Sequence, residues 1–171
     1  MWWFRVAAAL ACAVLLAGCG FHPLNARQSN GDSTVARLSQ VKIELIEDRR
    51  GQELRNDLLD RLNPDGQPGQ PRYSLAVVID EANTSVAIAK DASTIRNNLA
   101  ITAHYKLTDL STGKSLYEGY VNGLNSYAEI TNSYSTIVGQ KDAESRVLSS
   151  MADDISRRLA LYFQRSASEQ P

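Results

Sequence analysis

The sequence has few of the side chains that most often carry chemistry. Its 171 residues include two cysteines and two histidines, which excludes a zinc site made of four cysteines. Aromatic residues make up 7% of the chain, and 18 basic residues are balanced by 19 acidic ones. This near-neutral charge argues against a nucleic-acid-binding protein held by a general positive field. The remaining composition, 43% hydrophobic and 22% charged, is that of a globular protein of one domain.

Familiar catalytic motifs are missing as well. The sequence contains no nucleophile elbow, phosphate-binding loop, dinucleotide-binding glycine motif or zinc-protease helix motif. His104 lies on the polar face of a predicted strand, and the spacing places no nucleophile or orienting acid beside it. We therefore expect no enzyme, no metal and no cofactor. A lipid-anchored hydrolase stays open only if His104 meets a buried serine and an aspartate in the folded chain.

No apolar run is long enough for an ordinary transmembrane helix. The first one, residues 6–16, has eleven residues and follows a single positive charge, Arg5, as in the core of a secretory signal peptide. It leads into leucine, alanine, glycine and cysteine at 16–19, which resembles a bacterial lipoprotein lipobox. Small residues fit the groove of the signal peptidase, and a cysteine at the first mature position offers a thiol for acylation.

Cleavage before Cys19 sets the expected domain organisation. Residues 1–18 form the signal peptide and take Cys12 with them, so the mature chain has no disulfide partner for Cys19. Residues 19–40 are polar and rich in small side chains, which predicts a lipid anchor and a flexible tether. Residues 41–165 then form one domain, and 166–171 a frayed tail. By resemblance to such lipoproteins, glycine rather than aspartate after the cysteine indicates the outer membrane.

Hydrophobic periodicity predicts the elements of the domain. Apolar residues alternate over 41–45 and again in runs that begin near residues 73, 99 and 116, as in half-buried strands. A four-residue apolar spacing predicts amphipathic helices over 53–62 and 143–162. Loops or turns are expected at 47–50, 63–71, 83–85 and 111–114, and a strand end plus loop at 125–139.

The predicted order β-α-β-β-β-α defines an α+β fold. A strand, a helix and a second strand of one sheet imply a right-handed crossover and one parallel pair. The later strands are joined by short turns and are therefore antiparallel. We expect a two-layer sandwich in which two helices pack on one face of a four-stranded mixed sheet.

Three cations lie in segments that suggest a phosphate-binding role. Lys90 and Arg96 stand among small polar residues between two predicted strands, and Lys141 precedes the last helix. An arginine grips phosphate in bidentate fashion, and an ammonium group adds a point charge. The alternative is that all three are ordinary surface charges that bind nothing.

Several of these segments resemble one family, the lipopolysaccharide-assembly lipoproteins of the LptE family. The resemblance is carried by the sequences Cys-Gly-Phe-His-Pro-Leu at 19–24, Leu-Arg-Asn at 54–56, Ala-Ile-Ala-Lys-Asp-Ala-Ser-Thr-Ile-Arg-Asn at 87–97 and Gln-Lys-Asp at 140–142. It spans nearly all of the mature chain, although each motif is short. The proline-rich loop at 64–71 departs from the family pattern.

The resemblance implies a non-enzymatic role at the outer membrane. Members of this family plug the lumen of the outer-membrane β-barrel LptD, bind lipopolysaccharide and help to place it in the outer leaflet. By resemblance, Arg96 and Lys141 are the basic positions for lipopolysaccharide, with Lys90 as a third candidate. The polar stretch 125–140, with Tyr127 and Tyr134, is a candidate for contacts with the barrel lumen, and a loop without such contacts is the alternative.

A second role shares the anchor and the small sandwich. The chain could serve as a lipid-anchored chaperone or pilotin for another outer-membrane assembly, differing from the first role only in its partner. Identifying the partner discriminates between the two.

Overall fold

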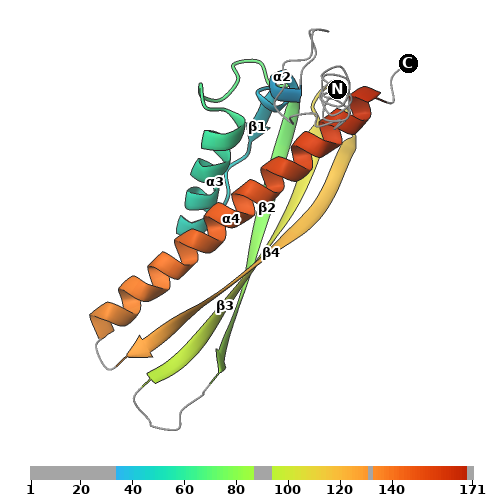
Figure 1. Cartoon of the computed structure of the whole chain (residues 1–171). Helices are drawn as coiled ribbons and strands as arrows, with labels where there is room; N and C mark the ends of the chain where they lie inside the picture. The colour runs from blue at the N-terminus through green and yellow to red at the C-terminus, as the bar shows by residue number, and fades with distance from the viewer. Residues whose placement is uncertain (1–33, 87–93, 131–132, 169–171) are drawn as a thin grey trace, which may run out of the picture.

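The computed structural model of the chain describes residues 34–86, 94–130 and 133–168. Figure 1 shows a sheet of long twisted strands with a long helix laid diagonally across one face and a shorter helix beside it. In chain order the elements are α2 (Thr34–Leu38), β1 (Val41–Ile43), α3 (Asp48–Leu62), β2 (Tyr73–Val86), β3 (Thr94–Asp109), β4 (Ser115–Ile130) and α4 (Ser133–Ser168).

The sheet confirms the predicted α+β architecture. Its strand order is β1-β2-β3-β4, with β1 parallel to β2 and the other neighbours antiparallel. Helix α3 forms the crossover between the parallel pair, and the helices pack on one face as predicted. The order follows the chain because each of β2, β3 and β4 pairs with the strand that precedes it.

The core lies between the helices and the face of the sheet that they cover. From Leu99 to Asp109 of β3 every second side chain is buried, and in β2 Leu75 and Val77 are buried on either side of the exposed Ala76, as in a sheet with one covered face. The helices contribute stripes at three- and four-residue spacing. The fully buried large side chains are Ile43, Leu54, Leu58, Leu75, Leu99, Ile101, Leu107, Leu148, Met151, Ile155, Leu159 and Phe163.

Two glycines of β4 allow close approaches to the strand. A Cβ at Gly123 would overlap Val147 Cγ1 of α4, so the absence of a side chain lets the helix lie directly on the strand. At Gly119 the space is filled by the ring of Tyr105, whose hydroxyl would lie 2.7 Å from an added Cβ. Burial raises the pKa of the Tyr105 phenol to about 12.

The hairpin turn predicted at 111–114 is present and is held by one carboxylate. Asp109 accepts hydrogen bonds from the backbone N–H of Ser111 at 2.8 Å and of Thr112 at 3.2 Å. The Ser111 hydroxyl also donates to it, and this hydrogen bond is the largest cause of a lowered Asp109 pKa. Gly113 closes the turn with a φ of 69°, a conformation that glycine adopts without steric cost.

Several boundaries differ from the sequence expectation. The charged run at 47–50, expected as a turn, enters α3, which begins at Asp48. Residues 83–85, also expected as a turn, continue β2 because they pair with 97–99 of β3. Strand β1 ends at Ile43, two residues earlier than the alternation suggested. In each case a partner elsewhere in the chain overrides the local pattern.

The two ends of the domain contain more helix than the sequence analysis predicted. The segment 125–139, expected as a strand end plus loop, instead completes β4 and begins α4 at Ser133. Helix α4 also continues through Ser168, beyond the expected helix end at 162, and α2 lies within the segment assigned to the tether. Adding turns to an existing helix costs less than starting one, so a strong helical core extends into segments with weak periodicity.

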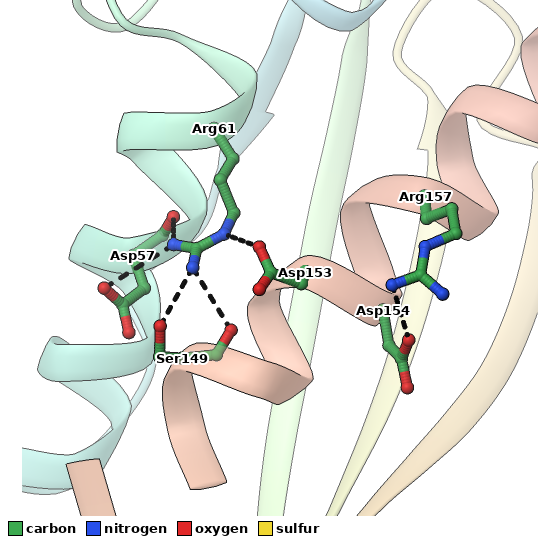
Figure 2. Close-up of polar contacts among 6 residues, drawn as sticks. All are labelled: Asp57, Arg61, Ser149, Asp153, Asp154 and Arg157. Carbon is green, nitrogen blue, oxygen red and sulfur yellow. Dashed lines mark hydrogen bonds and ion pairs between the residues drawn. The ribbon is translucent and has the colours of Figure 1, made fainter. Parts of the chain in front are cut away.

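Helices α3 and α4 are joined by Arg61, as Figure 2 shows. Its guanidinium donates to Asp153 Oδ1 at 2.5 Å, to the Asp57 carbonyl at 2.7 Å and to Ser149 Oγ at 2.9 Å. The hydrogen bond to Asp153 is the largest cause of a raised Arg61 pKa. The Arg61 side chain therefore contributes several polar contacts between the two helices.

We expect Arg61→Ala to lower the free energy of unfolding by about 1.5 kcal/mol, because several charge-assisted hydrogen bonds between the helices are lost together. The matched control is Arg157→Ala. Arg157 is bonded at 3.3 Å to Asp154 within the exposed surface of α4, so its loss should cost less than about 0.5 kcal/mol. Urea unfolding monitored by circular dichroism measures both. Equal effects of the two substitutions would contradict the proposed role of Arg61.

Candidate functional site

A groove of about 840 Å³ lies between α3, β2 and α4, within the size range of ligand sites. One wall is the link from β1 into the first turn of α3, the second is the first half of α4, and the floor is the middle of β2. The link bends sharply at Asp48, whose φ is 66°. The lining residues are Leu45–Gly51 of the link and α3, Ala76–Ile79 of β2, and Ile137, Gln140, Lys141 and Glu144 of α4.

An ion pair ties the two walls together. Arg50 Nε of α3 donates to Glu144 Oε1 of α4 at 2.5 Å, and only 11% of the Glu144 side chain is exposed. The pairing offsets the cost of burying the carboxylate and holds the helices apart at a fixed distance. The groove is therefore a built feature of the fold, formed where α3 and α4 diverge from the sheet.

The rim of the groove is both apolar and charged. Leu45 and Ile137 on the two walls are 77% and 51% exposed, and Val78 of the floor strand is 62% exposed on the face of the sheet away from the helices. Lys141 is also exposed on the α4 wall. A ligand or partner that covered this rim would meet apolar surface beside a cation.

Of the three predicted phosphate-binding cations, only Lys141 has a side chain that the structure describes, and it lines the groove. Arg96 lies in β3, where its backbone pairs with Val86 on one side and Ala128 on the other. Lys90 lies outside the described residues, as does the predicted lipidation site, Cys19.

His104 is placed where the periodicity predicted it, on the uncovered face of the sheet. Its Nε2 lies 3.7 Å from Asp80 Oδ2, and its ring centroid lies 5.9 Å from that of Tyr120. The histidine side chain is 58% exposed and the aspartate 70%, so the pair is solvated. His104 and Asp80 therefore form a pair on the surface. The contacts described for His104 are to Asp80 and Tyr120, which are both exposed, whereas a hydrolase would require a buried serine and an aspartate.

The described ranges contain neither clustered metal ligands nor a helix suited to cross a membrane. No group of three or more histidine, cysteine, aspartate or glutamate side chains there could hold a metal ion. Among the helices of residues 34–168 that the structure describes, none is both long and apolar enough to cross a membrane.

Sequence reasoning missed the apolar rim. Leu45 was expected to be buried with the first strand, but β1 stops at Ile43 and leaves it outside. Ile137 belonged to a segment expected as loop, and Val78 faces away from the helices on β2. The apolar run of five residues at 75–79, in which Val78 stands where alternation predicts a polar residue, was a signal available in the sequence.

The described residues thus form a two-layer α+β domain, and an amphipathic groove lies between its helices and β2. The family model of LptE, described as lipopolysaccharide-assembly, matches residues 38–161. The chain belongs to the LptE family, as the sequence motifs predicted.

Individual relatives agree with this fold. An uncharacterized protein of Rickettsia prowazekii, RP188, is 29% identical over 128 residues, which are 75% of this chain and 80% of that protein. A crystal structure from Caulobacter crescentus, described as a lipoprotein candidate, superposes with a TM-score of 0.64 at 23% identity and covers 81% of this chain and 98% of that one. A minor lipoprotein of Acinetobacter baumannii gives a TM-score of 0.51 at 13% identity, covering 71% and 91%.

Proposed function

We propose that this chain is an outer-membrane lipoprotein that plugs the barrel LptD and helps to assemble lipopolysaccharide into the outer leaflet. Membership of the lipopolysaccharide-assembly family supports the process. The proposal that lipopolysaccharide is the ligand rests on Lys141, which is exposed in a groove whose rim also exposes Leu45 and Ile137. Lipopolysaccharide combines phosphates with acyl chains, so a cation beside apolar surface matches its chemistry.

The uncovered face of the sheet supports the plug role. Its cross-strand pairs are mostly polar, and a barrel interior of the outer membrane is polar too. A domain that fills such a lumen needs hydrogen-bonding groups on the surface that it presents. The pairs are Lys106–Glu118 at 2.9 Å, Thr102–Asn122 at 3.0 Å, Ser126–Asn98 at 2.9 Å and His104–Asp80 at 3.7 Å.

The anchor and the remaining basic positions complete the proposal. Cys19 carries the lipid and stands fifteen residues before Thr34, the first residue of α2 (34 − 19 = 15). Fifteen residues span at most about 50 Å, so the domain stays close to the membrane surface. Arg96 and Lys90 act with Lys141 on the phosphates, and no catalytic step is involved.

The partner is tested by co-purification. A carboxyl-terminally tagged copy, extracted in mild detergent from its own outer membrane, should recover a barrel of the LptD type in about equal molar amount. The matched variant Cys19→Ser removes the lipid but leaves the domain intact, so it should still recover the barrel when both are brought together in detergent. Recovery of no barrel would contradict the plug role. Recovery of a different outer-membrane assembly would favour the chaperone or pilotin role.

A further inference from the structure

Strand β2 has a free edge on the side of β1. The pairing between them ends where the Glu44 N–H donates to the Leu75 carbonyl at 3.0 Å, after which the chain turns away into α3. Strand β2 continues for another eleven residues, Ala76 to Val86, which pair on their other side with β3. Beyond Leu75, therefore, one edge of this strand has no neighbouring strand among the described residues.

Two residues of this edge open into the groove. Because the Leu75 carbonyl points toward β1, the N–H and C=O groups of Val77 and Ile79 point the same way. Both residues line the groove, and in the described part of the chain neither makes a backbone hydrogen bond on that side. The floor of the groove thus presents two donors and two acceptors in the spacing of a strand edge.

The unpaired backbone groups of the floor favour a peptide over an acyl chain as the molecule that lies on it. An acyl chain laid over Val77 and Ile79 would exclude water from backbone groups that it cannot hydrogen-bond, which is costly. An extended peptide would pair with the same groups. Residues 76–79 of this edge carry no proline or charged side chain of the kind that usually blocks such pairing, and the first charges along the strand are Asp80 and Glu81.

We propose that the edge of β2 at Val77 and Ile79 takes up a short extended segment of the barrel partner as an added strand. This inference rests on the proposed function, because a plug inside a barrel is surrounded by the polypeptide of that barrel. It assigns to the groove floor a contact with protein and leaves Lys141, on the α4 wall, for the phosphate. The added strand continues the line of β1 past the point where the chain leaves the sheet.

Hydrogen exchange with residue resolution tests the pairing. In the co-purified complex the amides of Val77 and Ile79 should exchange at least about tenfold more slowly than in the free full-length chain. The amides of Ala76 and Val78 point toward β3 and are bonded in both states, so they serve as the internal control. If the complex forms and the exchange at Val77 and Ile79 does not change, the added strand is wrong while the plug role stands.

An edge variant gives a second measurement. Val78→Lys places a charge on the free edge at a side chain that is 62% exposed, and it should abolish the added protection at Val77 and Ile79 in the complex. Leu124→Lys is the matched control, since Leu124 is 71% exposed on β4, which lies at the opposite edge of the sheet, and it should leave the protection intact. Retention of the protection by Val78→Lys would overturn the inference. Failure of wild type to recover any barrel would overturn the proposed function itself.

Discussion

Gly123→Ala is expected to lower the free energy of unfolding by about 2–3 kcal/mol. The added methyl group would overlap Val147 Cγ1 and lie 3.0 Å from Met151 Sδ, so it needs space that the core does not have. Val147 is 4% exposed and stiff at χ1, and it cannot rotate away without displacing its neighbours. Relief therefore requires α4 to move off β4. Thermal or urea unfolding measures the loss.

Gly139→Ala is the matched control, and its effect should have the opposite sign. Gly139 lies inside α4, and a Cβ built there meets nothing within 4 Å. Replacing a helical glycine by alanine removes backbone freedom from the unfolded chain, so we expect a gain of about 0.5–1 kcal/mol. A destabilisation by Gly139→Ala as large as that of Gly123→Ala would show that packing of α4 on β4 is not what Gly123 provides.

The largest expected functional effect is that of combined charge reversal on lipopolysaccharide binding. Arg96→Glu together with Lys141→Glu should weaken binding of purified lipopolysaccharide about a hundredfold. Each contact of a cation with phosphate contributes about 1.4 kcal/mol or more, and reversal adds repulsion. Lys141 is exposed, so its reversal should leave the unfolding transition unchanged. Binding is measured by fluorescence titration at a fixed ionic strength, because the attraction is screened by salt.

The control for this experiment is Lys114→Glu. Lys114 is exposed in the turn between β3 and β4, outside the groove, so its reversal changes the net charge by the same amount as the Lys141 change. It should leave binding close to wild type. If the double variant binds as tightly as wild type, the assignment of these residues to lipopolysaccharide fails. If the double variant binds more weakly, the single variants Arg96→Glu and Lys141→Glu show which of the two residues contributes more to binding.

Most of the secondary structure could be predicted from the sequence. Strand alternation over residues 73–79 and 99–107 and the four-residue spacing of Val147, Met151, Ile155 and Leu159 are local consequences of which side faces the core. The element order then left few topologies, and the right-handed crossover implied the parallel pair.

Element boundaries could not be predicted because contacts distant in sequence set them. The run at 47–50 is polar and resembles a turn, yet Arg50 meets Glu144 across 94 residues and the helix begins before it. Residues 83–85 carry turn-forming side chains, yet pairing with β3 holds them extended. In both segments the partner that decides the conformation is invisible to a local pattern.

By itself the sequence determined the α+β class, the covered face of the sheet and the family, because each follows from side-chain type and spacing along the chain. Only the tertiary structure decided where the groove lies, that Lys141 lines it and how far β2 extends beyond β1. These depend on where β1 stops and on contacts between residues far apart in the sequence. Examples are the Arg50–Glu144 pair between α3 and α4 and the close approach of α4 to Gly123.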